Sequence, residues 1–130
     1  PVGATINGIV VEIERKKTGT GTIEDWQVLI VKNGATAGSE HSIAGAWPGA
    51  DTYQTYGNST DLWGTTWTVA EINAANFGVK LAVQESGNVN PAGGDVDHFR
   101  ITVYYTPAGG MGKRIFQSQT RDTSILKKAA

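Results

Sequence analysis

The sequence predicts an all-β protein: an antiparallel β-sandwich of the jelly-roll kind, with one short helical turn and an extended C-terminal arm. Three observations support this class. Apolar and polar residues alternate in short runs rich in Val, Ile and Thr, 17 glycines supply tight turns, and no helical pattern separates the runs. A length of 130 residues fits one small domain, residues 1–106, followed by an appendage, residues 107–130.

The first two predicted strands differ in the placement of their apolar residues. In residues 6–15 the apolar side chains from Ile9 onward favour one face, which is typical of a half-buried strand. Residues 26–32 (WQVLIVK) are apolar on both faces, which predicts a central strand covered on both sides. The pair Asn33-Gly34 tolerates positive φ and predicts a hairpin turn directly after this strand.

The middle of the chain, residues 46–67, is irregular and predicts loops and short strands. Thr68 and Glu71 then have the spacing of a capping box, in which each side chain binds a free backbone N–H at a helix start. This spacing predicts one helical turn over residues 69–74.

Two more alternating runs predict the strands that complete the domain. Residues 77–84 and 96–106 each place large apolar side chains on one face and polar side chains on the other. Pro107 ends the second strand, because proline cannot donate a ladder hydrogen bond.

The charge changes sign at the same boundary. Residues 1–106 carry six Lys or Arg and eleven Asp or Glu, a net of −5, whereas residues 107–130 carry five and one, a net of +4. The near-neutral total argues against nucleic acid as a partner, and the lack of any long apolar run excludes a membrane-spanning helix. Without cysteine, the chain has neither a disulfide nor a thiolate metal site.

Three stretches carry a resemblance to a known family. They are PVGATINGIVVEIER (residues 1–15), STDLWGTTWTVAEINAANFGVKLAV (residues 59–83) and VDHFRITVYYT (residues 96–106). Together they resemble a β-sandwich module of phage and prophage virion structural proteins. In that module another strand precedes the GATI segment, so here either the fold lacks that strand or a neighbour supplies it.

The resemblance implies a component of the virion, an extracellular particle. The module is tail-associated, part of a fibre, or a protein that decorates a capsid or tube. It implies other virion proteins or copies of the same chain as partners, in a homo-oligomer or a lattice. It carries no catalytic residues over to this chain, and it does not extend past Thr106.

The C-terminal arm is the first candidate site. Its glycines give a flexible root, and it combines two apolar couplets with cations that suit an acidic neighbour. A disordered terminus is the alternative. The predicted partner-binding residues are Lys113, Arg114, Ile115, Phe116, Arg121, Ile125, Leu126, Lys127 and Lys128.

A group of aromatic residues in the irregular middle is the second candidate. Indole and phenol rings that are exposed can stack on sugar rings, whereas buried ones fill a core or an interface. The sequence alone leaves the three interpretations open. The possible glycan contacts are Trp47, Tyr53, Tyr56 and Trp63.

Enzymatic and metal sites have little support in the sequence. Asp95, Asp97 and His98 lack a metal-binding spacing, and we interpret them as a solvated strand start. Glu12 and Glu14 share one face of a strand, a spacing compatible with a carboxylate pair but also with simple solvation. We therefore expect no enzyme and no cofactor.

These observations predict a non-enzymatic structural subunit of a phage or phage-like particle, in which the arm clamps a neighbouring subunit. Part of the arm is expected to add a strand to the neighbour's sheet. The alternatives are a carbohydrate-binding, receptor-recognition module and a subunit of a bacterial extracellular filament.

Overall fold

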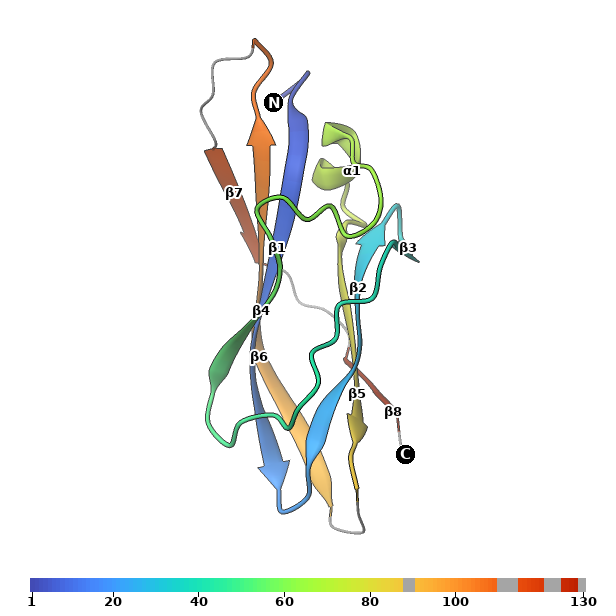
Figure 1. Cartoon of the computed structure of the whole chain (residues 1–130), viewed down its shortest axis with the longest axis vertical. Helices are drawn as coiled ribbons and strands as arrows, with labels where there is room; N and C mark the ends of the chain where they lie inside the picture. The colour runs from blue at the N-terminus through green and yellow to red at the C-terminus, as the bar shows by residue number, and fades with distance from the viewer. Residues whose placement is uncertain (88–90, 110–114, 121–124, 129–130) are drawn as a thin grey trace.

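The computed structural model describes residues 1–87, 91–109, 115–120 and 125–128, and it describes the last two segments as backbone strands. It contains two four-stranded sheets and one short helix (Figure 1). The strands are β1 (Thr5–Gly19), β2 (Ile23–Lys32), β3 (Ala35–Ala37), β4 (Thr52–Asn58), β5 (Gly78–Glu85), β6 (Ala92–Thr106), β7 (Ile115–Thr120) and β8 (Ile125–Lys128). The all-β class is confirmed, and the finer jelly-roll assignment stays a prediction.

The strand order is β4-β1-β6-β7 in one sheet and β3-β2-β5-β8 in the other. Neighbouring strands are antiparallel except β5 and β8, which are parallel. The long strands β1 and β6 pair from Thr5 opposite Thr106 to Gly19 opposite Ala92. Their pairing brings the start and the end of residues 1–106 together in the middle of one sheet.

A single hydrophobic core joins the two sheets, because alternate residues of the strands of each sheet point into it. The apolar residues predicted to face inward from Ile9, Phe77 and Phe99 onward are buried, as their alternation indicated. Among the residues whose side chains the structure describes, the buried core runs from Ile6 to Tyr105.

Strand β2 departs from its prediction. It is an inner strand of its sheet, but only one of its faces is buried, and Trp26 on the strand is 40% exposed. A register shift between Asp25 and Gln27 accompanies this exposed residue. The prediction of a strand covered on both sides is wrong, because its outward apolar residues Leu29 and Val31 are only half-buried.

The local turn and cap signals are confirmed. Asn33 and Gly34 both have positive φ, 53° and 80°, and join β2 to β3. Helix α1 (Val69–Asn73) begins at Thr68, and both capping-box bonds with Glu71 are present. It is the only helix in the described part of the chain, and no helix there is long and apolar enough to cross a membrane.

The free edge of β2 beyond β3 is covered by the connection to β4. In this connection, the backbone N–H of His41 donates to Val28, and that of Trp47 donates to Ile23. The carboxylate of Glu40 accepts a hydrogen bond from the N–H of Val28 at 2.8 Å. Figure 1 shows this connection crossing the front of the molecule from one sheet to the other. On this side of the molecule, residues 1–106 cover their own sheet edge.

Candidate assembly site

The C-terminal segment supplies one of the two edge strands of each sheet. Strand β7 lies antiparallel beside β6, from Ile115 opposite Tyr105 to Thr120 opposite Arg100. Strand β8 lies parallel beside β5, with Ile125 opposite Leu81. Figure 1 shows β7 at the edge of one sheet and β8 at the edge of the other.

This placement corrects one expectation from the sequence. The segment does not extend away from residues 1–106 but pairs with their sheets, because IFQSQT and ILKK are long enough to form a few ladder hydrogen bonds with an open edge. Pairing with a neighbour's sheet stays a prediction, as does the domain division at Thr106. Of the predicted arm residues, Lys113, Arg114 and Arg121 lie outside the described residues, whereas Ile115, Phe116, Ile125, Leu126, Lys127 and Lys128 lie in the two strands.

The two edges that receive these strands belong to the inner pair of each sheet. Strand β6 is otherwise bonded to β1, and β5 to β2. Within the described residues, β7 and β8 are the strands that cover these edges. An uncovered edge presents a row of unpaired N–H and C=O groups and is a template for another strand. The C-terminal strands therefore occupy the positions at which a neighbouring chain could pair.

The predicted glycan platform is wrong for three of its four residues. Trp47, Tyr56 and Trp63 are at most 2% exposed and belong to the core, so their rings have no free face for a sugar. Tyr53 is 39% exposed. The core interpretation of these aromatic residues is therefore the correct one for Trp47, Tyr56 and Trp63.

Tyr53 lies in a charged cluster on the outer face of its sheet. The guanidinium carbon of Arg100 lies 4.8 Å from the centre of its ring, and both Arg100 Nε and Nη2 donate to Glu12 at 2.7 Å. These hydrogen bonds hold the pKa of Glu12 below its ordinary value, in opposition to its partial burial. Glu12 is thus an ion-pair partner in a cross-strand contact, and it is not paired with Glu14 as a hydrolase carboxylate would be.

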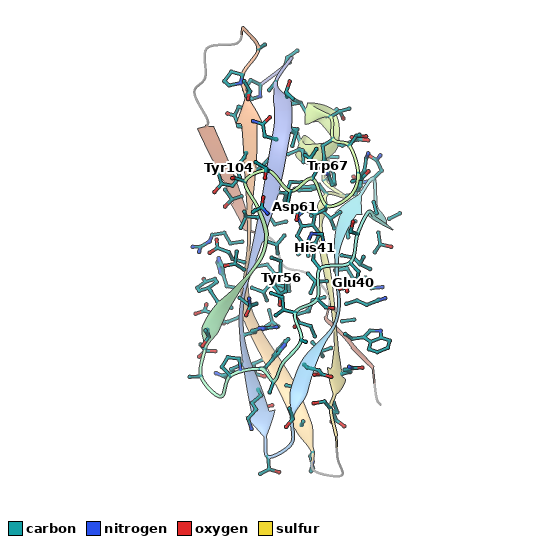
Figure 2. All side chains as sticks on the ribbon, in the orientation of Figure 1. Glu40, His41, Tyr56, Asp61, Trp67 and Tyr104 are labelled. Carbon is teal, nitrogen blue, oxygen red and sulfur yellow. The ribbon has the colours of Figure 1, made fainter. Side chains whose placement is uncertain are left out.

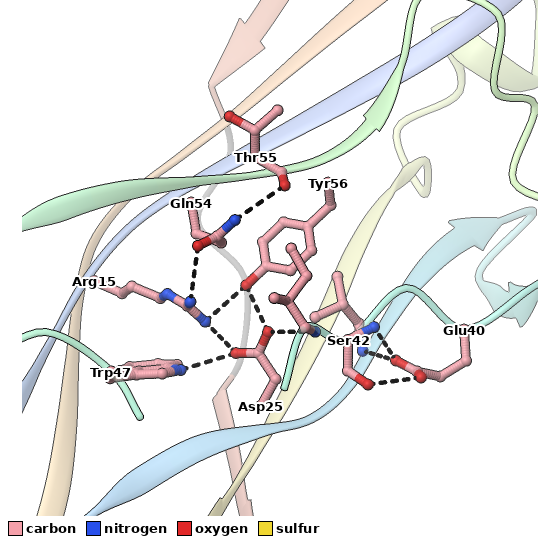
Figure 3. A network of polar contacts seen from close by, with 10 residues as sticks. Arg15, Asp25, Glu40, Ser42, Trp47, Gln54, Thr55 and Tyr56 are labelled. Atoms are coloured by element: carbon pink, nitrogen blue, oxygen red, sulfur yellow. Dashed lines mark hydrogen bonds and ion pairs between the residues drawn. The ribbon is translucent and has the colours of Figure 1, made fainter. Parts of the chain in front are cut away.

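A buried polar network lies between the sheets (Figure 3). Its centre is the carboxylate of Asp25, which is paired with Arg15. Three further groups donate to this carboxylate: Trp47 Nε1 at 2.8 Å, Tyr56 Oη at 2.8 Å and the backbone N–H of Ile43 at 3.1 Å. Asp25 is therefore satisfied on both oxygens although its side chain is fully buried.

Arg15 has its own set of contacts in this network. It donates to Tyr56 Oη at 2.8 Å and to Gln54 Oε1 at 3.2 Å, and its guanidinium lies 4.9 Å from the ring of Trp47. Burial, followed by the charge of Asp25, raises the pKa of Tyr56 far above its ordinary value, so its hydroxyl stays protonated and acts as a donor. This network joins β1 and β4 of one sheet to β2 of the other, and within it Arg15 Nε is a buried N–H without a hydrogen-bond partner.

The second polar cluster holds two loops against each other. His41 Nε2 lies 2.7 Å from Asp61 Oδ2, its Nδ1 lies 3.0 Å from the carbonyl of Ser39, and its ring stacks on Trp63 at 4.0 Å. The backbone N–H of Trp63 donates to Asp61 Oδ1 at 2.7 Å. Figure 2 shows His41 and Asp61 side by side near the middle of the molecule. Both nitrogens of His41 are engaged in contacts within the fold, which favours a structural role.

Glu40 makes a further contact at the edge of β2, close to this cluster. Burial raises the pKa of its carboxyl, but hydrogen bonds from the N–H groups of Val28 and Ser42 outweigh burial, and the pKa lies below its ordinary value. An ionised carboxylate here caps the β2 edge that β3 leaves free.

The Arg15–Asp25 pair was not identified from the sequence, although a signal for it exists. Arg15 continues the inward series of Ile9, Val11 and Ile13 at the same period of two, and Asp25 follows Ile23 at that period. Opposite charges at core-facing positions of two strands indicate a buried ion pair, because neither charge is stable there alone.

The predicted strand-start residues contribute to an open hollow. Asp95 and Asp97 line it together with Lys16 and Asp51. Lys16 Nζ donates to Asp51 at 3.2 Å, which raises the pKa of Lys16. Within the described ranges, no group of three or more His, Asp or Glu side chains is placed to hold a metal ion.

No family model matches the chain, and neither a curated protein nor a solved structure matches it. The fold and the site therefore stand on the sequence and the structure alone.

Proposed function

We propose that this chain is a non-enzymatic structural subunit of a phage or phage-like particle, a decoration protein or a component of a tail or fibre. It assembles when the C-terminal strands β7 and β8 pair with the sheet edges of a neighbouring subunit. The single observation that carries this proposal is the position of these strands, which form one edge of each sheet.

Three features of residues 1–106 support a binding role. Their described core, from Ile6 to Tyr105, draws on both sheets. Their net charge of −5 is opposite to the net +4 of residues 107–130, so the two parts attract at low ionic strength. The sequence resemblance to virion modules points to the same class of protein. A bacterial extracellular filament would use the same edges in the same way and is the alternative setting for this mechanism.

Hydrogen bonding and charge make separable contributions to the proposed assembly. A strand added to an edge gains backbone hydrogen bonds, each with a net contribution of about 0.5–1.5 kcal/mol. Exposed ion pairs contribute little and are screened by salt. We therefore expect the strand pairing to determine whether assembly occurs, and the cations to determine its salt dependence.

The double variant Gln117→Pro/Ser118→Pro is expected to abolish assembly. Neighbouring residues of a strand point their N–H groups to opposite sides, so this pair removes one N–H that faces β6 whichever residue carries it. The measurement is the molar mass of the full-length variant by light scattering, together with electron microscopy of the assembled form.

The matched control is Lys127→Gln/Lys128→Gln, which removes two charges and leaves the β8 backbone free to pair. We expect this variant to assemble with a weaker dependence on salt. Normal assembly of the proline variant, or complete loss of assembly in the glutamine variant at low salt, contradicts the proposed mechanism.

A further inference from the structure

We propose that the neighbour is a second copy of this chain, and that two copies exchange strands β7 and β8 reciprocally. This inference rests on the proposed function and names its partner. The strands that β7 and β8 fit are known, since they pair in register with β6 and β5. A partner that presents the same two edges in the same register is another molecule of this chain.

Exchange preserves the hydrogen bonds that the closed chain makes. If β7 of one copy lies on β6 of another, each ladder bond has the same donor and the same acceptor group as before. The two arrangements then differ mainly in the connection that precedes β7 and in the entropy of association. This makes the balance between the closed and exchanged forms sensitive to protein concentration.

The connection before β7 is too long to enforce pairing within one chain. Tyr105 is opposite Ile115, so the nine residues 106–114 separate the paired ends, whereas two residues join β2 to β3. Linkers of about this length give effective concentrations on the order of millimolar. Subunits packed in a particle reach similar concentrations, so a neighbour's edge can compete with the chain's own edge.

The exchanged segment would hold both sheets of its partner. Strand β7 pairs with the sheet that contains β6, and β8 pairs with the sheet that contains β5. A C-terminal segment that leaves the sheets of its own chain therefore bonds to both sheets of the partner chain. Its net +4 charge meets the −5 charge of residues 1–106 of the partner. Reciprocal exchange doubles each of these contacts in one dimer.

Engineered cysteines can report which chain supplies β7, because the natural sequence has none. Thr102 and Ser118 are directly opposite in the β6–β7 pair. Opposite residues of antiparallel strands have Cα atoms about 4.5–5.5 Å apart, within the range that a disulfide spans. Full-length Thr102→Cys and Ser118→Cys variants, one of them carrying a short mass tag, are refolded together at about 1 mM, the effective concentration of the linker, and then oxidised.

The mixed disulfide dimer of the two variants is the expected main product on a non-reducing gel, and its yield should fall on dilution. The control mixture pairs Thr102→Cys with Gln117→Cys, a position that lies opposite Val103 and not opposite Thr102. Fluorescence of the buried tryptophans checks that each variant is folded. If the mixed dimer does not exceed this control, and the double variant Thr102→Cys/Ser118→Cys closes a disulfide within one chain, the exchange is disproved.

Failure of the exchange and failure of the proposed function have different signatures. A disulfide closed within one chain, combined with loss of assembly in the proline variant, means that the strands are needed for assembly but are not exchanged between two copies. Normal assembly of the proline variant means that the strands do not mediate assembly at all.

Discussion

Asp25→Leu is expected to lower the free energy of unfolding by about 3–5 kcal/mol, because it leaves the buried guanidinium of Arg15 without a counter-charge. It also removes the acceptor of three more donors, from Trp47, Tyr56 and Ile43. Chemical denaturation followed by tryptophan fluorescence measures the change.

Arg15→Met is expected to cost less than Asp25→Leu. The carboxylate of Asp25 keeps three hydrogen-bond donors when the guanidinium is removed, whereas Arg15 keeps only Tyr56 and Gln54 when the carboxylate is removed. The matched control is Lys16→Met, on the adjacent residue, whose ion pair with Asp51 is exposed, and it should leave stability unchanged. An equal loss for the two buried substitutions, or a small loss for both, contradicts the role of Asp25 as the centre of the network.

Trp63→Ala is expected to lower the free energy of unfolding by about 3–5 kcal/mol, the usual cost of deleting a large buried aromatic side chain. The substitution leaves a cavity, removes the stack with His41 and leaves the carbonyl of Ile9 without the indole N–H that donates to it at 2.9 Å. The measurement is the same denaturation experiment, followed by circular dichroism because a tryptophan has been removed.

Trp26→Ala provides the comparison for this variant. It deletes the same type of side chain at a position that is 40% exposed, so a clearly smaller loss is expected. Similar losses at the two positions would show that burial does not explain the effect of Trp63.

The elements that the sequence predicted best are those with strong local signals. Alternation in β1, β5 and β6 identified which residues face the core, since a strand buries every second side chain. Asn33-Gly34 and the Thr68–Glu71 box were correct because a positive φ and a free helix-start N–H each require particular residues.

Other features depend on the tertiary arrangement and were not predictable in the same way. Strand β2 has apolar residues on both faces, which suggested that both faces are covered. Only the face toward the other sheet is buried. Exposed and buried aromatic rings have the same local pattern, so burial of Trp47, Tyr56 and Trp63 required the fold.

The candidate assembly site was likewise predictable from the sequence only in part. Composition identified residues 107–130 as a segment with distinct charge. The choice of edges, β6 for one strand and β5 for the other, depends on which edges the fold leaves open. No residue pattern in ILKK encodes the parallel pairing of β8 with β5.

The most direct test of the central claim compares the full chain with a chain that ends at Thr106, in both unfolding and association. Because the shorter chain keeps the described core from Ile6 to Tyr105, we expect it to unfold cooperatively near the midpoint of the full chain. We also expect it to remain a monomer under conditions in which the full chain associates. A shorter chain that fails to fold, or that associates as strongly as the full chain, would contradict the claim that β7 and β8 are assembly strands.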